Sequence, residues 1–240
     1  METYEEFLAR INSFETGELC FESDEFKGNP SLKKKLNQDN TFRDFFGDTI
    51  AFGLDKKVKD RLAEWIEELY REVPQCFAER LHTDTFHMTL HDLSSSGSLT
   101  NVVADVFVNE LKVREKIKGI RPVEIIRMKS TYIFNMTDTS LVLGLIPADA
   151  EEYGKLMELY QAFDEVKKLD YPMTPHITLA YFSRLGFDAE AAGKLKQLVN
   201  KWNEEELKGE MEVFLNCRSL YYQKFSSMND YVNVLPIYDK

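Results

Sequence analysis

Hydrophobic residues along this 240-residue chain recur with two different spacings, and the two spacings alternate beyond residue 47. Short stretches in which apolar and polar residues alternate, or that are mainly apolar, predict β-strands, because successive side chains on a strand point to opposite faces. These stretches cover residues 49–54, 85–91, 123–128, 140–146, 175–181, 211–222 and 231–237. Between them lie segments with apolar residues three or four positions apart, a spacing typical of amphipathic helices.

Four long helices are predicted in these segments. The residues at their starts are Asp55, Thr100, Asp149 and Asp188. A short polar side chain at a helix start can accept a hydrogen bond from the first free backbone amides. The residues expected to face inward are Val58, Leu62, Trp65, Leu69 and Val73; Val103, Phe107 and Leu111; Tyr153, Leu156, Tyr160, Phe163 and Val166; and Ala192, Leu195, Val199 and Trp202.

The order of the predicted elements repeats weakly between the two halves of this region. In each half, a helix is followed by a strand, a loop and a second long helix. Periodicity alone indicates an α+β fold. The internal symmetry fits a two-lobed version of it, with an antiparallel sheet and helices in each lobe and a central cleft. We therefore expect one bilobal domain over residues 48–240, with a turn or flexible loop at the serine-rich residues 94–98.

Residues 1–47 are expected to form an N-terminal extension. A helix is predicted near residues 3–14, followed by a stretch rich in turn residues and charge. We expect the extension to pack on one lobe, and the alternative is a lid over the cleft. The run Lys33-Lys34-Lys35 is expected to be a solvated helix face and not an RNA contact.

One short polar motif occurs twice, as His87-Met88-Thr89-Leu90 and as His176-Ile177-Thr178-Leu179. Both copies lie in predicted strands, so the His and Thr of each copy share one face and the apolar residues take the other. If the two strands are neighbours, two imidazoles and two hydroxyls face a single spot.

This combination suits in-line cleavage of a P–O bond. The reaction needs a base to activate water and an acid to protonate the leaving oxygen, and imidazole fills either role near neutral pH. A hydroxyl on the same face can donate to a non-bridging phosphate oxygen. We expect His176 to act as the base and His87 as the acid, although the residues alone fit the reverse assignment. Thr89 and Thr178 are expected to hold the phosphate.

The paired motifs resemble those of the 2H phosphoesterase superfamily, which includes bacterial 2′-5′ RNA ligase-like proteins and RNA cyclic phosphodiesterases. Its signature is two His-x-Thr/Ser motifs on strands, each followed by an apolar residue. The resemblance covers about residues 48–238 and implies a bilobal fold with one motif in each lobe. It implies hydrolysis of a 2′,3′-cyclic phosphate or a 2′-5′ linkage without a metal or other cofactor. Many relatives continue the second motif with Ala-Arg, whereas here Tyr181 follows Ala180 and the nearest arginine is Arg184.

Further candidate substrate contacts are His91, Tyr132, Tyr181, Phe182 and Arg184. His91 is included because it shares the predicted strand face of the first motif. The three aromatic residues lie near the predicted sheets, where a ring can stack on a base, and a guanidinium can neutralise phosphate charge. We expect no metal site, because two histidines four positions apart ligate a metal from a helix and the first motif reads as a strand. The fourth histidine, His82, is expected at the surface.

Composition narrows the substrate class. The net charge of −11 does not suit a protein that follows a long phosphate backbone, which usually carries a basic face. We therefore expect a small nucleotide or an RNA 3′ end as substrate, and no long duplex. Two alternatives stay open, namely a hydrolase of cyclic oligonucleotide signals and a module that binds nucleotides or RNA ends without turnover. A structural domain with no ligand is the third possibility.

The remaining features concern location and assembly. The three cysteines, Cys20, Cys76 and Cys217, form no CxxC pair and are expected to be reduced thiols of a cytoplasmic protein. No apolar run is long enough to span a membrane, and the acidic N-terminus lacks the features of a signal peptide. We expect a monomer with no membrane partner.

Overall fold

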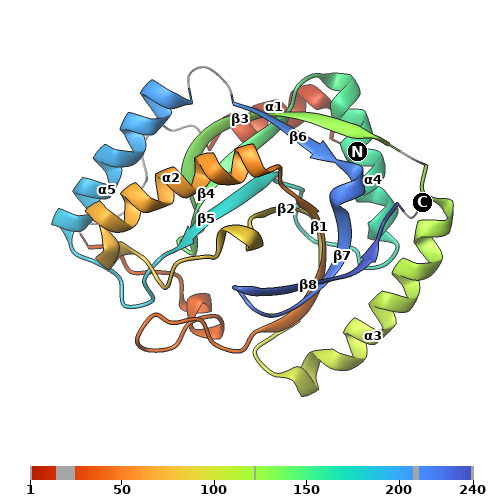
Figure 1. Cartoon of the computed structure of the whole chain (residues 1–240), viewed down its shortest axis with the longest axis horizontal. Helices are drawn as coiled ribbons and strands as arrows, with labels where there is room; N and C mark the ends of the chain where they lie inside the picture. Colours follow the sequence, from red (N-terminus) through yellow and green to blue (C-terminus); the bar gives the residue numbers. More distant parts are fainter. Residues whose placement is uncertain (1, 15–24, 122, 208–210, 239–240) are drawn as a thin grey trace.

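The computed structural model describes residues 2–14, 25–121, 123–207 and 211–238, and within them it has one antiparallel sheet of eight strands (Figure 1). The strands are β1 (Phe46–Gly53), β2 (His87–Ser96), β3 (Ile125–Met136), β4 (Ser140–Pro147), β5 (His176–Tyr181), β6 (Glu212–Asn216), β7 (Leu220–Ser227) and β8 (Asp230–Pro236). Their order across the sheet is β6-β3-β4-β5-β2-β1-β7-β8. The sheet is strongly curled, as Figure 1 shows for the half that contains β1, β7 and β8.

The α-helices of the described residues flank this sheet. They are α1 (Tyr4–Asn12), α2 (Lys56–Glu72), α3 (Leu99–Lys116), α4 (Ala150–Asp164) and α5 (Ala189–Lys201). α2 packs against α5 and β5, α3 packs on β1 and β2, and α4 packs on β2, β3 and β4. In Figure 1, α5 lies to the left of the sheet, α2 crosses the view over β4 and β5, and α3 lies at the lower right. Within the described chain, no helix combines the length and the apolar character that a membrane crossing requires.

The two sequence motifs lie on the central strands β2 and β5, where the halves of the sheet meet. One residue pair, Met88 with Ile177, joins these strands in the described chain. On either side of this junction, the units β1–α2–β2 and β4–α4–β5 have the same order and pairing. The predicted α+β fold with two pseudo-symmetric lobes is confirmed. The lobes share one continuous sheet, however, instead of having a sheet each.

The inward faces predicted for α2, α4 and α5 are confirmed, since all the residues named for them are buried. Asp149 and Asp188 are N-caps whose side chains accept hydrogen bonds from backbone amides of the first helical turn. Asp55 is the N-cap of α2 but makes no such side-chain hydrogen bond. In these helices the predicted apolar stripe lies on the buried face.

The face predicted for α3 is wrong. The residues expected inside are exposed, namely Val103, Phe107 and Leu111. The residues buried instead are Val102, Asn109 and Val113. Asn109 explains this orientation, because its amide donates to the two carboxylate oxygens of the buried Asp48 at 3.2 and 3.1 Å. The spacing of apolar residues does not reveal a buried polar contact of this kind.

Three other local predictions are also wrong. The first part of the serine-rich stretch 94–98 is not a loop, because β2 continues to Ser96. The Ser94 amide donates to Asp48 Oδ1 at 2.8 Å. Ser98, and not Thr100, is the N-cap of α3. The strand predicted over residues 211–222 is divided by a turn into β6 and β7, which pair with β3 and β1 in opposite halves of the sheet.

The described residues before β1 pack on the body of the protein in two places. Phe7 and Ile11 of α1 cluster with Tyr153 of α4. Residues 25–45 lie beside the loop after β5, where the backbone of Phe26 pairs with that of Phe187. Gly186, with a φ of 76°, permits this approach, because an added Cβ would lie 2.1 Å from the Phe26 carbonyl oxygen.

The described cysteines, Cys76 and Cys217, are buried free thiols. Burial raises the pKa of each thiol to about 12, so both are unreactive in the folded protein. Cys20 lies outside the described residues.

Candidate active site

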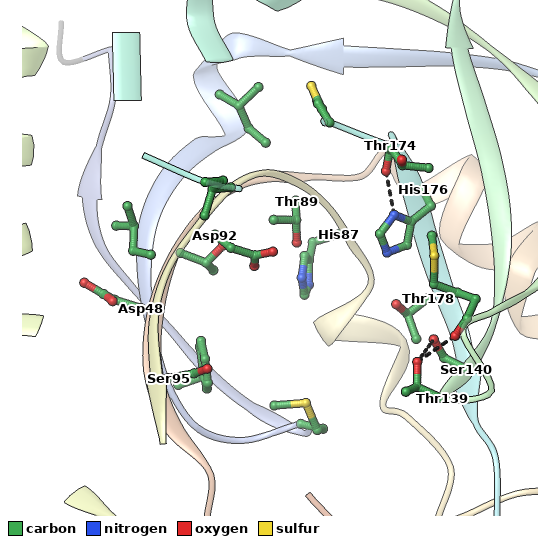
Figure 2. A pocket seen from close by; sticks show the side chains of 18 of the residues that line it. Asp48, His87, Thr89, Asp92, Ser95, Thr139, Ser140, Thr174, His176 and Thr178 are labelled. Atoms are coloured by element: carbon green, nitrogen blue, oxygen red, sulfur yellow. Dashed lines mark hydrogen bonds between the residues drawn. The ribbon is translucent and has the colours of Figure 1, made fainter. Parts of the chain in front are cut away.

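A cavity of about 820 Å³ lies over β2 and β5 and contains both sequence motifs. His87, Thr89, His176 and Thr178 line it, and Figure 2 shows the four side chains facing the same open space. Because Met88 pairs with Ile177, the antiparallel register sets His87 level with Thr178 and Thr89 level with His176. The structure therefore brings the two imidazoles and the two hydroxyls of the motifs together.

The two imidazoles are held in the same way. His87 Nδ1 lies 2.6 Å from the Thr85 carbonyl oxygen, and His176 Nδ1 lies 2.7 Å from the Thr174 carbonyl oxygen, the contact drawn in Figure 2. A carbonyl oxygen only accepts hydrogen bonds, so Nδ1 carries the hydrogen in both rings. Nε2 is therefore the nitrogen of each ring that is free to take or give a proton.

Burial lowers the pKa of both histidines from the ordinary value, because it disfavours the charged imidazolium. The carbonyl hydrogen bonds and the negative charge of Asp92 oppose this shift in both rings. The charge of His176 lowers the pKa of His87 further, and that of Lys35 lowers the pKa of His176. Two coupled imidazoles of this kind can share one proton, which is the state that paired acid and base catalysis requires.

Each motif strand has a β-bulge at the leucine of its motif. On β2, adjacent residues of β1 pair with Thr89 and His91, so Leu90 is an extra residue. On β5, the same irregularity makes Leu179 the extra residue. A bulge of one residue shifts the alternation of side chains by one position. Beyond each bulge, the side chains therefore face the opposite way from the prediction.

His91 faces away from the cavity, so its prediction as a substrate contact is wrong. Its side chain is fully buried, with Nδ1 2.8 Å from the Asp92 carbonyl oxygen and Nε2 3.1 Å from Asp164 Oδ1. Its ring packs on Tyr160 with 4.9 Å between the ring centres. The bulge at Leu90 is the reason, because it turns His91 to the face opposite that of His87.

Asp92 takes the place on the cavity wall that simple alternation assigns to His91. Figure 2 shows its carboxylate directed toward His87 and Thr89. The Tyr171 hydroxyl donates to Asp92 Oδ2 at 2.8 Å. Sequence analysis missed Asp92, because strand alternation without the bulge places this side chain on the face away from the cavity.

Of the other predicted contacts, Tyr181 lines the cavity, and it does so because the bulge at Leu179 turns it inward. The predictions for Tyr132, Phe182 and Arg184 are wrong. Tyr132 is buried on β3, which β4 separates from β5, and Phe182 is fully buried on the face opposite that of Tyr181. Arg184 turns to the N-terminal part of the chain, where Nη1 donates to the Leu36 carbonyl oxygen at 2.9 Å.

Aromatic residues that sequence analysis missed line the cavity beside His87, and we call Phe45, Phe225 and Tyr231 the aromatic wall. The Tyr231 ring centre lies 4.9 Å from that of His87 and 5.3 Å from that of Phe225, which stacks on Phe45. Burial raises the pKa of Tyr231 well above its ordinary value, so its hydroxyl stays protonated. Rings placed in this way can stack on a nucleobase.

No group of three or more His, Cys, Asp or Glu side chains in the described chain is arranged to hold a metal ion. The groups that line the cavity are imidazoles, hydroxyls, lysines, aromatic rings and the carboxylates of Asp48, Asp92 and Asp170. This set suits proton transfer and the binding of an anion.

No protein-family model matches the chain, and neither does any curated protein. A solved structure of ATU0111, a conserved protein of unknown function from Agrobacterium tumefaciens, is similar over 95% of this chain and 99% of that chain, with a TM-score of 0.70 and 14% sequence identity. This likeness establishes a common fold and nothing about activity.

Two further solved structures are less similar. Escherichia coli LigT complexed with 3′-AMP has a TM-score of 0.49 and 14% identity, over 80% of this chain and 96% of that chain. A structure described as a phosphoesterase has a TM-score of 0.48 and 15% identity, over 79% of this chain and 95% of that chain. Likenesses of this strength do not assign a function, which has to come from the side chains in the cavity.

Proposed function

We propose that this protein is a metal-independent phosphodiesterase of the 2H type that acts on a nucleotide or an RNA 3′ end. The best-matched substrate is a 2′,3′-cyclic phosphate, and a 2′-5′ linkage is a close variant. One observation carries the proposal: two imidazoles with free Nε2 atoms and two threonine hydroxyls face one cavity from the two halves of the sheet.

In the proposed hydrolysis, His176 Nε2 takes a proton from water as the water attacks phosphorus. His87 Nε2 gives a proton to the ribose oxygen on the opposite side as the P–O bond breaks. Thr89 and Thr178 donate to the non-bridging oxygens, whose negative charge grows in the transition state. Nearby positive charge lowers the pKa of both rings, with Lys35 acting on His176 and Lys59 on His87, so the assignment of roles follows the expectation from the sequence.

The shape and charge of the cavity support a small substrate. A volume of about 820 Å³ is in the range of small-molecule sites and accommodates a mononucleotide. The aromatic wall offers a surface for the base, and the net charge of −11 disfavours a long duplex. We expect the protein to act as a monomer in the cytoplasm, where buried thiols stay reduced.

The first experiment is turnover of the four nucleoside 2′,3′-cyclic monophosphates, and of a short RNA that ends in a cyclic phosphate, with EDTA present. We expect cleavage by the wild type and a loss of about 10²–10⁴-fold in each of His87→Ala and His176→Ala. His82→Ala is the matched control, because His82 is exposed and outside the cavity. The product isomer shows which P–O bond breaks.

Activity that requires a divalent ion, or that survives both substitutions, would contradict the mechanism. If the cyclic mononucleotides and the RNA end stay intact, cyclic oligonucleotides and 2′-5′-linked oligonucleotides are the next substrates. Binding of nucleotides without turnover of any of them would favour the binding-module alternative.

A further inference from the structure

Lys35 reaches the cavity from the N-terminal part of the chain. It directly follows a short 3₁₀ helix, η1 (Pro30–Lys34), and it lines the cavity together with the two motifs. Lys33 and Lys34 are exposed on the same turn and do not line the cavity. The prediction that the whole lysine run is a solvated helix face is therefore wrong for Lys35.

Packing fixes the backbone of Lys35. Leu32 and Leu36 are buried in the main hydrophobic core. The Lys35 amide donates to the Leu32 carbonyl oxygen at 2.9 Å, and its own carbonyl oxygen accepts from the Arg43 amide at 3.0 Å. The side chain therefore enters the cavity from a defined point, and its direction does not depend on a mobile surface turn.

Inside the cavity, the Lys35 ammonium has uncharged partners. Nζ donates to the Tyr181 hydroxyl at 3.3 Å. It lies 4.8 Å from the centre of the Tyr181 ring and 5.4 Å from the centre of the Phe45 ring. Tyr181 is the last residue of β5, the strand that carries His176 and Thr178. The ammonium therefore lies close to the second motif, and its charge lowers the pKa of His176.

We propose that Lys35 binds a non-bridging oxygen of the substrate phosphate, so that residues 25–45 complete the active site; this inference rests on the phosphodiesterase function proposed above. A phosphodiester is an anion, and a lysine ammonium binds phosphate as a point charge. No arginine lines the cavity in the described part of the chain. Two other lysines line it, Lys167 and Lys168, and both lie on the segment before β5 and not at the second motif; Lys167 already donates to the Leu93 carbonyl oxygen.

The test compares Lys35→Met with Lys33→Met and Lys34→Met. The three variants carry the same change on one turn of the chain, but only the first alters the cavity. Two quantities are measured at constant ionic strength: the Kd for inorganic phosphate by calorimetric titration, and kcat/KM for a 2′,3′-cyclic phosphate. We expect Lys35→Met to weaken phosphate binding measurably and to lower kcat/KM by about 10²–10³-fold. The two controls should stay within about twofold of the wild type, because exposed charges outside a site have small effects.

The phosphate titration separates this inference from the proposed function. If no phosphodiester is cleaved but Lys35→Met loses the phosphate affinity of the wild type, the phosphodiesterase proposal fails and the role of Lys35 stands. Equal phosphate affinity in the two proteins, or a wild type that does not bind phosphate, would overturn the role of Lys35. Lys35→Arg keeps the charge and should retain most of the binding. If Lys35→Met does not fold, Lys35→Gln replaces it, since it keeps a polar group beside Tyr181.

Discussion

Asp92 and Tyr181 occupy equivalent positions in the two halves of the sheet. Each is the fifth residue after a motif histidine, and each faces the cavity because a bulge at the motif leucine shifts the alternation. Asp92 accepts a hydrogen bond from Tyr171, whereas Tyr181 accepts one from Lys35. The pseudo-symmetric site is therefore electrically asymmetric, with an anion beside one motif and a cation beside the other. The charge of Asp92 nevertheless reaches both rings, because it raises the pKa of His87 and of His176.

Asp92→Asn should move the pH profile toward acid. The charge of Asp92 raises the pKa of both histidines, so its removal lowers both values. The alkaline limb of kcat/KM marks the loss of the proton from the acid, and the acidic limb marks protonation of the base. Both limbs should therefore shift to lower pH.

The measurement is kcat/KM as a function of pH, in buffers of equal ionic strength. In the wild type, burial places the alkaline limb below the ordinary histidine pKa of about 6.5. The matched control is Asp105→Asn, an exposed position on α3 that removes the same charge. An unchanged profile in Asp92→Asn would show that this carboxylate does not act on the catalytic protons.

The shared face of the His and Thr in each motif could be predicted from strand alternation, whereas the meeting of His87 and His176 is expected from the resemblance to a family with one motif in each lobe. The side chains that follow each motif on its strand could not be assigned to the correct face from the sequence. Alternation assumes an unbroken strand, and the bulge at Leu90 reverses the faces of His91 and Asp92. The spacing of residues does not reveal where a strand bulges, since that depends on pairing with its neighbour.

Tertiary docking limits prediction in the same way. α3 buries Asn109, which contacts the buried Asp48, and leaves apolar side chains such as Phe107 exposed. Lys35 enters the cavity because residues 25–45 dock beside the loop after β5. Both contacts join residues that are far apart in the sequence, so local patterns do not encode them.

Thr89→Val and Thr178→Val should each lower kcat by about 10–10³-fold, because each removes one hydrogen bond to a non-bridging oxygen in the transition state. KM should change little, since the bond strengthens mainly in the transition state. Steady-state kinetics with a 2′,3′-cyclic phosphate measures both constants. Thr100→Val, an exposed position at the start of α3, is the control. If kcat falls by less than about twofold in both cavity variants, the hydroxyls do not stabilise the transition state.

His91→Ala should destabilise the fold. The substitution empties a fully buried site beside Tyr160 and removes the partner of Asp164, at an expected cost of about 2–4 kcal/mol. Urea denaturation measures this difference, and His82→Ala should stay within about 0.5 kcal/mol of the wild type. If the His91→Ala variant keeps its stability but loses turnover, His91 contacts the substrate and its role is not structural.

Tyr231 offers a test of how the base is recognised. If its ring stacks on the nucleobase, Tyr231→Ala should raise KM for a nucleoside 2′,3′-cyclic phosphate by about tenfold, which corresponds to a stacking energy of about 1–3 kcal/mol. Tyr231→Phe keeps the ring and should behave as the wild type. The matched substrate is ribose 2′,3′-cyclic phosphate without a base, for which Tyr231→Ala should change KM little.

Each outcome of this comparison identifies a different role for Tyr231. Its ring centre lies 4.9 Å from that of His87, so it is placed either to hold that imidazole or to contact the base. An equal loss with the baseless substrate would mean that the ring supports His87. An equal loss in Tyr231→Phe and Tyr231→Ala would mean that the hydroxyl, which its raised pKa keeps protonated, matters more than the ring. Only a loss confined to Tyr231→Ala and to substrates that carry a base supports stacking on the aromatic wall.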